Sequence, residues 1–116
     1  MVLGGTEDPT GSLRRGLLEY CVLAMLAREP LYAFDVVRRL GDLDGLATSE
    51  GTIYPLLTRL RTKGWLSSTW VPSDAGPPRR YYELTQGGRR VLDVFADDWR
   101  RVSATVDALL PRPENT

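Results

Sequence analysis

The sequence contains no histidine and only one cysteine, Cys21, which lies among apolar residues. It also lacks the glycine loop that cradles phosphates and any spacing of residues typical of a metal site. The neighbouring acids Asp97 and Asp98 would diverge by roughly 100° on a helix, which is unfavourable for a shared acid and base. We therefore expect no enzyme, no cofactor and no metal.

Long hydrophobic runs are absent as well. The longest apolar stretch, residues 17–27, is interrupted by Glu19 and is far shorter than the roughly 20 residues that span a bilayer. Residues 1–11 have neither a basic start nor an apolar run, so we expect a disordered tail and not a signal peptide. A single cysteine fits a reducing cytoplasm. We expect a cytoplasmic protein of one modest domain, with no membrane partner.

The chain also has no net charge, because 15 basic residues balance 15 acidic ones. The charges are unevenly distributed: residues 49–90 carry a net charge of +4, and the segments on either side carry −2 each. Attraction to phosphate is local, since salt screens it over about 8 to 10 Å. A nucleic-acid partner for residues 49–90 is therefore compatible with the neutral total.

The segment from residue 49 to 66 has the pattern of an amphipathic helix. Its apolar residues at i, i+3, i+4 and i+7 predict one buried face: Ile53, Leu56, Leu57 and Leu60. The opposite face carries the small residues Gly51, Pro55, Thr58 and Thr62. Thr52 and Arg59 flank one edge of this face, and Tyr54 and Arg61 flank the other. We expect Ser49 or Thr48 to cap the helix and Lys63 with Gly64 to end it. A slim polar ridge suits a major groove about 12 Å wide, although an ordinary surface helix has a similar pattern.

A β-hairpin is predicted directly after this helix. Residues 65–71 are rich in β-branched and aromatic residues, residues 72–78 form a cluster of turn residues, and residues 79–84 form a second strand. A helix that runs into a basic hairpin is the arrangement of a winged helix. Arg79 and Arg80 can contact phosphates or a minor groove, or they can serve only as charge partners or for solubility.

These segments resemble the PadR-type transcriptional regulators, in a short form with one C-terminal helix. The resemblance covers approximately residues 13–110 and is carried by the run GTIYPLLTRL at 51–60, Gly64-Trp65-Leu66, Trp70, Gly76-Pro77, and RRYYELT at 79–85 with Gly88. We expect a mainly α fold with a small β-hairpin, a winged helix-turn-helix plus a C-terminal dimerisation helix. The expected divisions are a tail at 1–11, the winged helix-turn-helix at 12–85, the dimerisation helix at 86–110 and a tail at 111–116.

The remaining helices follow from apolar spacing. We expect a first helix at about residues 13–27, a second at 31–40, and a C-terminal helix that Thr85 caps and Pro111 ends. The C-terminal helix carries a heptad seam, which we expect to form a homodimer interface: Leu92, Phe95, Trp99, Val102, Val106 and Leu109. The alternative is that this seam packs against the chain's own core.

Trp99 has two interpretations. It can simply fill the dimer seam, or, as the resemblance implies, it can stack on a planar aromatic effector between two subunits, as in multidrug-responsive members. The residues expected to line that effector site are Leu13, Gly16, Tyr20, Phe95 and Trp99.

The sequence thus predicts a homodimeric DNA-binding regulator, a repressor that a small molecule releases from its double-stranded operator. The residues expected to contact DNA are Ser49, Thr52, Tyr54, Pro55, Thr58, Arg59, Arg61, Lys63, Arg79 and Arg80. Two alternatives remain open: a winged helix that binds a protein instead of DNA, and a regulator without a ligand.

Overall fold

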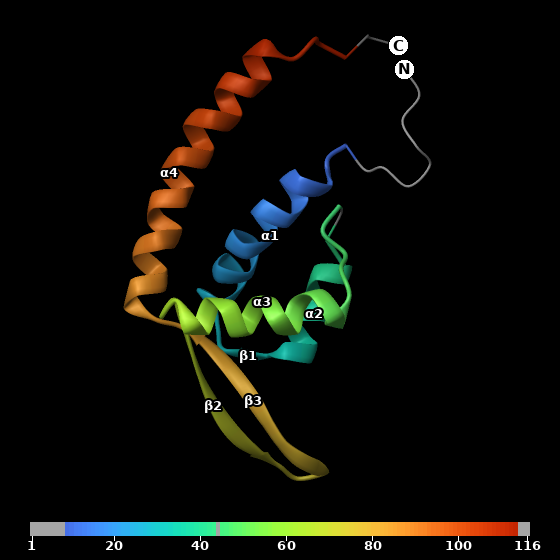
Figure 1. Cartoon of the computed structure of the whole chain (residues 1–116), viewed down its shortest axis with the longest axis vertical. Helices are drawn as coiled ribbons and strands as arrows, with labels where there is room; N and C mark the ends of the chain where they lie inside the picture. The colour runs from blue at the N-terminus through green and yellow to red at the C-terminus, as the bar shows by residue number, and fades with distance from the viewer. Residues whose placement is uncertain (1–8, 44, 114–116) are drawn as a thin grey trace.

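The computed structural model describes residues 9–43 and 45–113. In these residues four helices accompany one three-stranded antiparallel sheet (Figure 1). In chain order the elements are α1 (Gly11–Leu26), β1 (Leu31–Tyr32), α2 (Ala33–Gly41), α3 (Glu50–Thr62), β2 (Leu66–Ser73), β3 (Gly76–Leu84) and α4 (Gln86–Leu109). The predicted fold class, a mainly α winged helix-turn-helix with an added C-terminal helix, is confirmed. Parts of the two predicted tails, residues 1–8 and 114–116, lie outside the described residues.

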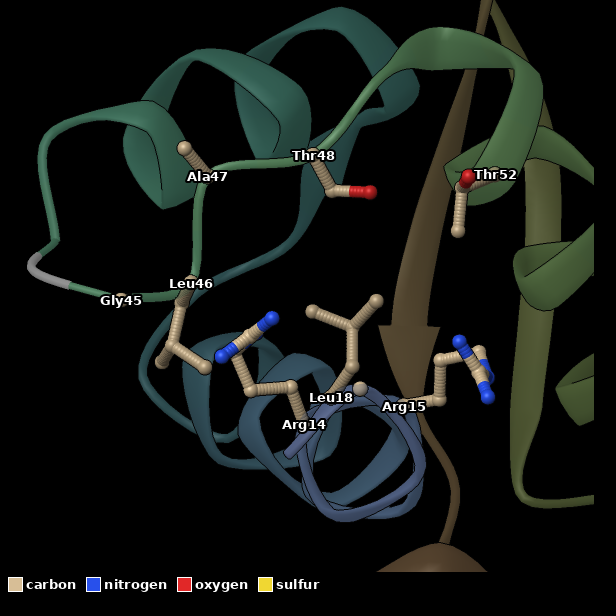
Figure 2. A pocket seen from close by; sticks show the side chains of 9 residues that line it. Arg14, Arg15, Leu18, Gly45, Leu46, Ala47, Thr48 and Thr52 are labelled. Atoms are coloured by element: carbon tan, nitrogen blue, oxygen red, sulfur yellow. The ribbon is translucent and has the colours of Figure 1, made fainter. Parts of the chain in front are cut away.

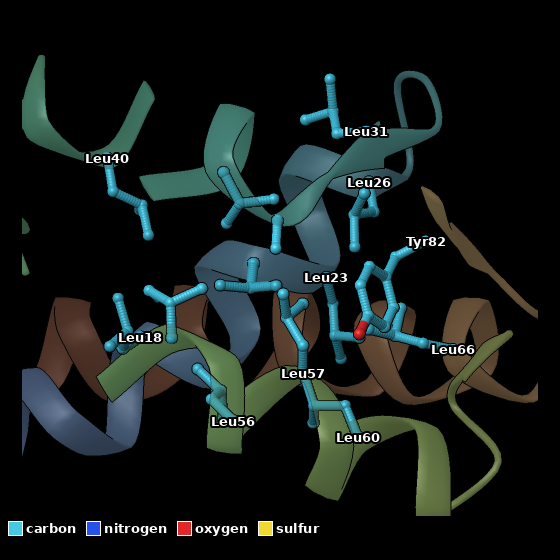
Figure 3. Close-up of a cluster of buried hydrophobic side chains, with 14 residues drawn as sticks. Leu18, Leu23, Leu26, Leu31, Leu40, Leu56, Leu57, Leu60, Leu66 and Tyr82 are labelled. Atoms are coloured by element: carbon cyan, nitrogen blue, oxygen red, sulfur yellow. The ribbon is translucent and has the colours of Figure 1, made fainter. Parts of the chain in front are cut away.

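The core lies where α1, α2, α3 and the base of the sheet meet (Figure 3). The four predicted positions of α3, Ile53, Leu56, Leu57 and Leu60, are all buried, which confirms the stripe read from the sequence. Leu31 and Leu66 and the ring of Tyr82 close the core from the sheet side. No charged residue is buried as a whole in the described part of the chain, although the Nε atoms of Arg61 and Arg80 are buried. Burial of apolar surface therefore holds the three helices in a fixed arrangement.

The start of the second helix differs from the prediction. Residues 31 and 32 form the strand β1, which pairs with Tyr82 and Tyr81 of β3, and α2 begins only at Ala33. Apolar spacing alone favoured a helix from Leu31. The backbone pairing that makes these residues a strand comes from a partner about fifty residues away, so no local pattern contains it.

The hairpin formed by β2 and β3, here called the wing, is longer than predicted and has a tighter tip. The strands extend to Ser73 and from Gly76, so only Asp74 and Ala75 lie between them, and the expected loop at 72–78 is wrong. Pro72 is tolerated because β2 is an edge strand in the order β1-β3-β2 and because the pairing is irregular between Val71 and Ser73. Pro77 and Pro78 lie on the part of β3 that pairs with β2 alone, since β1 pairs only with Tyr81 and Tyr82.

The end of α3 is fixed by its backbone. The amide of Gly64 donates to the carbonyl of Arg61 over 2.9 Å, and the amide of Trp65 donates to the carbonyl of Leu60 over 3.0 Å. Gly64 has a φ of 82°, a conformation that other residues rarely adopt. These two hydrogen bonds direct the chain from the end of α3 into β2, so the wing has a fixed position relative to α3.

Helix α4 is anchored at its start and then leaves the body of the molecule (Figure 1). As predicted, Thr85 caps it: the Thr85 hydroxyl accepts from the amide of Gly88 over 3.0 Å, and it donates to the carbonyl of Gly64 over 2.7 Å. The same threonine therefore joins the first turn of α4 to the end of α3.

Candidate nucleic-acid interface

The outward side of α3 is a narrow ridge of small residues. Gly51, Pro55, Thr58 and Thr62 lie opposite the buried stripe and are all exposed. Pro55 lies within the helix, and its missing N–H leaves the carbonyl of Gly51 without the usual helical donor. Ser49 occupies the N-cap position, but its side chain makes no capping hydrogen bond and its Oγ lies 3.3 Å from Oγ1 of Thr52. A ridge of this width lets the helix backbone approach another surface closely.

The shoulders of this ridge face different parts of the fold. Thr52 lines a hollow shared with α1, whereas Tyr54 lines a hollow shared with α2 and the wing. Tyr54 is 42% exposed, and partial burial, followed by the nearby Glu50 carboxylate, raises the pKa of its phenol. The hydroxyl of Tyr54 is therefore a neutral hydrogen-bonding group at physiological pH.

Two arginines of the wing lie against aromatic rings. The guanidinium carbon of Arg79 is 4.7 Å from the ring centroid of Tyr32, and that of Arg80 is 4.8 Å from the ring centroid of Trp70. These contacts restrict the two side chains at the middle of the wing, where Trp70 and Val71 pair with Arg80 and Arg79. They border a hollow of about 400 Å³ between α2, α3 and the wing, also lined by Phe34 and Tyr54.

Sequence reasoning missed three residues at this hollow: Tyr32, Phe34 and Trp70. The position of Trp70 opposite Arg80 follows from the strand register, which a correct hairpin alignment would have indicated. The position of Tyr32 depends on β1, which no local pattern in the sequence indicates. Both Phe34 and Trp70 are exposed, so this face of the molecule presents aromatic surface beside positive charge.

Ion pairing separates Lys63 from the other basic residues predicted to bind DNA. The ammonium of Lys63 is 3.0 Å from a carboxylate oxygen of Glu19 on α1 and 4.5 Å from the ring centroid of Trp65. By contrast, no ion pair with a carboxylate occurs within residues 9–43 and 45–113 for the other four: Arg59, Arg61, Arg79 and Arg80. Those four guanidinium groups keep their charge available for an anionic partner.

Comparison with known proteins decides the family. Residues 22–94 match the transcriptional regulator PadR-like family. The chain belongs to this family. It is 40% identical to a PadR-like transcription factor from Bacteroides fragilis, with a TM-score of 0.75, covering 90% of this chain and 100% of that one. No match was found among curated proteins.

Two further solved PadR-like regulators have the same fold. The one from Bacillus cereus is 34% identical with a TM-score of 0.80, and the match covers 89% of this chain and 100% of that chain. The one from Eggerthella lenta is 38% identical with a TM-score of 0.77, and it covers 88% of both chains. This chain is thus a PadR-family transcriptional regulator, and PadR regulators bind DNA.

The predicted dimer seam of this PadR chain is largely uncovered. Leu92 and Phe95 are half-buried against the body of the molecule, but four later positions are exposed: Trp99 (43%), Val102 (55%), Val106 (45%) and Leu109 (80%). The seam therefore does not pack against the chain's own core beyond Phe95. In the described part of the PadR chain, no helix has the length and apolar character needed to cross a membrane.

The residues predicted to bind an effector are only partly brought together. The rings of Tyr20 and Phe95 stack in parallel, with centroids 4.2 Å apart and an interplanar angle of 3°, and Trp99 continues the row at 6.1 Å from Phe95. A hollow of about 310 Å³ lies beside the first pair. Leu13, Gly16 and Trp99 are not among its lining residues, so the chain alone does not form the full predicted site.

Proposed function

We propose that this PadR regulator acts as a homodimeric repressor that binds operator DNA with two copies of α3 and the wing. The observation that carries the proposal is the slim ridge of α3 bordered by arginines that have no carboxylate partner in the described residues. A helix with a small ridge enters a major groove, and free guanidinium groups on its shoulders meet phosphates and guanines.

Within this interface we assign different roles to different side chains. Thr52, Tyr54, Pro55 and Thr58 meet base edges from the first turns of α3, with Ser49 at the helix start. Arg59 and Arg61 meet phosphates or guanines, and Arg79 and Arg80 reach the neighbouring groove from the wing. Lys63 contributes less, because Glu19 already neutralises its charge.

A second copy of the chain covers the exposed seam of α4. Four exposed apolar side chains at heptad spacing are costly in water, and a partner helix with the same spacing buries them. Dimerisation also presents two α3 helices to half-sites about 34 Å apart, which compensates for the modest charge of each copy.

The row of rings from Tyr20 through Phe95 to Trp99 supports a planar aromatic effector. Because Tyr20 and Phe95 already cover each other, we expect the ligand to lie on the exposed Trp99 between two subunits, with Leu13 and Gly16 nearby. Such a ligand changes the angle between the subunits and hence the spacing of the two α3 helices, which weakens operator binding.

The test begins with a protection footprint on the DNA upstream of the regulator's own gene. We expect two protected patches one helical turn apart, and a lower affinity for random DNA with a strong salt dependence. Val102→Asp should dissociate the dimer in sedimentation and abolish the footprint, whereas Ala104→Asp, on the opposite side of α4, should preserve both. Protein capture without salt-dependent DNA binding would instead identify a protein-interaction module.

The effector is tested separately by tryptophan fluorescence. Planar aromatic compounds, titrated into the dimer, should quench the emission and lower operator affinity, and both responses should disappear in Trp99→Ala. Quenching that persists in Trp99→Ala places the ligand elsewhere. An absence of any response across such compounds would leave a repressor controlled by its abundance alone.

A further inference from the structure

Helix α1 begins with a basic stretch on the side that faces the core. Gly11 and Leu18 are buried, and positions 14 and 15 share their face because they lie three or four residues away from both. Arginines occupy both positions, and both are exposed. The core thus ends at Leu18. Towards the N-terminus, the same face of α1 carries the two arginines, which lie beside the segment that connects α2 to α3.

These arginines border a hollow of about 220 Å³ at the start of α3. Figure 2 shows Arg14 and Arg15 on either side of Leu18, with Thr48 and Thr52 across from them. The rest of the wall is the segment from Gly45 to Ala47. Every charged group that lines the hollow is positive, and the threonines add hydroxyl groups. The hollow therefore suits a small anion with several oxygen atoms.

The hydrogen-bond partner of Arg15 leaves its positive charge in place. Nη2 of Arg15 donates to the Ser12 hydroxyl over 3.3 Å. A hydroxyl group does not neutralise a guanidinium. For Arg15, no ion pair with a carboxylate is present in the part of the chain that the structure describes, unlike Arg38 and Arg39 in the last turn of α2.

We propose that this hollow holds a DNA phosphate and that α1 is therefore part of the DNA interface, which deepens and rests on the function proposed above. A helix in a major groove has one sugar-phosphate strand on each side. The Tyr54 shoulder of α3 faces the wing, so the strand there meets Arg79 and Arg80. The Thr52 shoulder faces the hollow, so the other strand meets Arg15.

A phosphate contact has a distinct signature in a salt titration. Each contact contributes about 0.9 to the slope of log K against log salt, so losing one per subunit lowers the slope of a dimer by about 1.8. The advantage of the wild-type protein over Arg15→Ala should then shrink roughly tenfold between 50 and 200 mM salt. The loss should be equal for the upstream fragment and for a random duplex of the same length, because phosphate contacts carry no sequence information.

The experiment compares Arg15→Ala, Arg15→Lys and Arg28→Ala, each measured with both duplexes and by sedimentation. Arg28 is an exposed arginine just beyond the C-terminal end of α1, without an ion pair in the described residues, and its loss should leave the slope unchanged. Arg15→Lys keeps the charge and should retain most of the slope. Both substitutions of Arg15 should leave the dimer and its melting temperature intact.

Each other outcome overturns the proposal in a recognisable way. If the wild-type protein shows no salt-dependent DNA binding, the proposed function fails and the phosphate site fails with it. If DNA binding is normal but Arg15→Ala matches Arg28→Ala, only the phosphate site is wrong. If Arg15→Ala dissociates the dimer, the hollow receives a carboxylate of the second copy instead of a phosphate.

Discussion

The contact between the start of α4 and the base of the wing predicts opposite effects for alanine at two adjacent glycines. A Cβ atom at Gly88 would lie 2.1 Å from the carbonyl oxygen of Trp65 and 2.7 Å from Cδ1 of Leu84. A Cβ at Gly87 would meet nothing closer than 3.6 Å. Both residues lie in the first turn of the same helix, so their intrinsic helix preferences are the same. The two substitutions differ mainly in this clash.

The magnitude follows from the geometry. Relieving the clash at Gly88 moves α4 by about 1 Å against backbone, and it also strains the hydrogen bond from the Gly88 amide to Thr85. Overpacking of this kind costs about 1 to 3 kcal/mol, and a lost cap costs about 1 kcal/mol more. Alanine returns roughly 0.5 to 1 kcal/mol of helix preference at either position. We expect Gly88→Ala to lose about 2 to 3 kcal/mol and Gly87→Ala to be neutral or slightly stabilising.

Thermal unfolding followed by circular dichroism measures the difference. With an unfolding entropy of about 2.1 cal/mol/K per residue, a loss of 2 to 3 kcal/mol lowers the Tm of a chain of this size by roughly 10 °C. All samples need the same protein concentration, because dimerisation makes Tm depend on it. If Gly88→Ala melts within about two degrees of Gly87→Ala, the close approach of α4 to the wing is not a constraint and the reasoning is refuted.

Three further predictions rest on individual contacts. Thr85→Ala should lower the free energy of unfolding by about 1 to 2 kcal/mol in urea titrations, because the Thr85 hydroxyl both caps α4 and donates to the carbonyl of Gly64. Thr85→Ser keeps the hydroxyl and should retain most of the wild-type stability. Equal losses of stability in the two variants would contradict this role. A double-mutant cycle on Glu19 and Lys63 should give a coupling below about 1 kcal/mol, since the lysine is 41% exposed, and Lys63→Ala should change the salt slope of DNA binding less than Arg59→Ala does. Burial raises the pKa of the Cys21 thiol, so a thiol reagent at pH 8 should label the folded protein more slowly than the urea-unfolded protein. Burial of the neutral thiol therefore contributes to stability fully below the ordinary thiol pKa, and this contribution is lost as the pH rises through the raised pKa. If the stability difference between the wild-type protein and Cys21→Ala stays the same from pH 8 to 10, this prediction is wrong.

Those parts of the fold that depend on near neighbours could be predicted from the sequence. The buried stripe of α3 follows from a spacing of three and four residues, and its end at Gly64 follows from the conformation that a helix terminus requires. The strand at Leu31 and Tyr32 could not be predicted this way, because it exists only through pairing with β3. The prolines of the wing were misleading for a related reason. Pro72 lies on the edge strand β2, and Pro77 and Pro78 lie on the part of β3 that β1 does not reach, so each has an unpaired side that depends on the whole sheet.

The same distinction applies to the candidate site. The arginines of α3 and the wing were found because basic residues cluster within one stretch of sequence. The ion pair that removes Lys63 from this group joins residues 44 positions apart, and the rings beneath Arg79 and Arg80 come from a distant strand and from across the hairpin. Arg15 was missed because α1 approaches the start of α3 only in the folded chain.

The neutral total charge is compatible with DNA binding because the acids neutralise other basic residues. In the described residues, ion pairs with carboxylates occur at Arg38, Arg39, Lys63, Arg100 and Arg101. Apart from Lys63, these lie on α2 and α4, away from the ridge of α3. The arginines on the shoulders of the ridge have no such partner, and salt screens them from charges more than about 8 Å away. Acids on α4 therefore lower the total charge without lowering the potential at the ridge. For this reason the salt dependence of binding should reflect the few unpaired arginines around α3 and not the net charge of the protein.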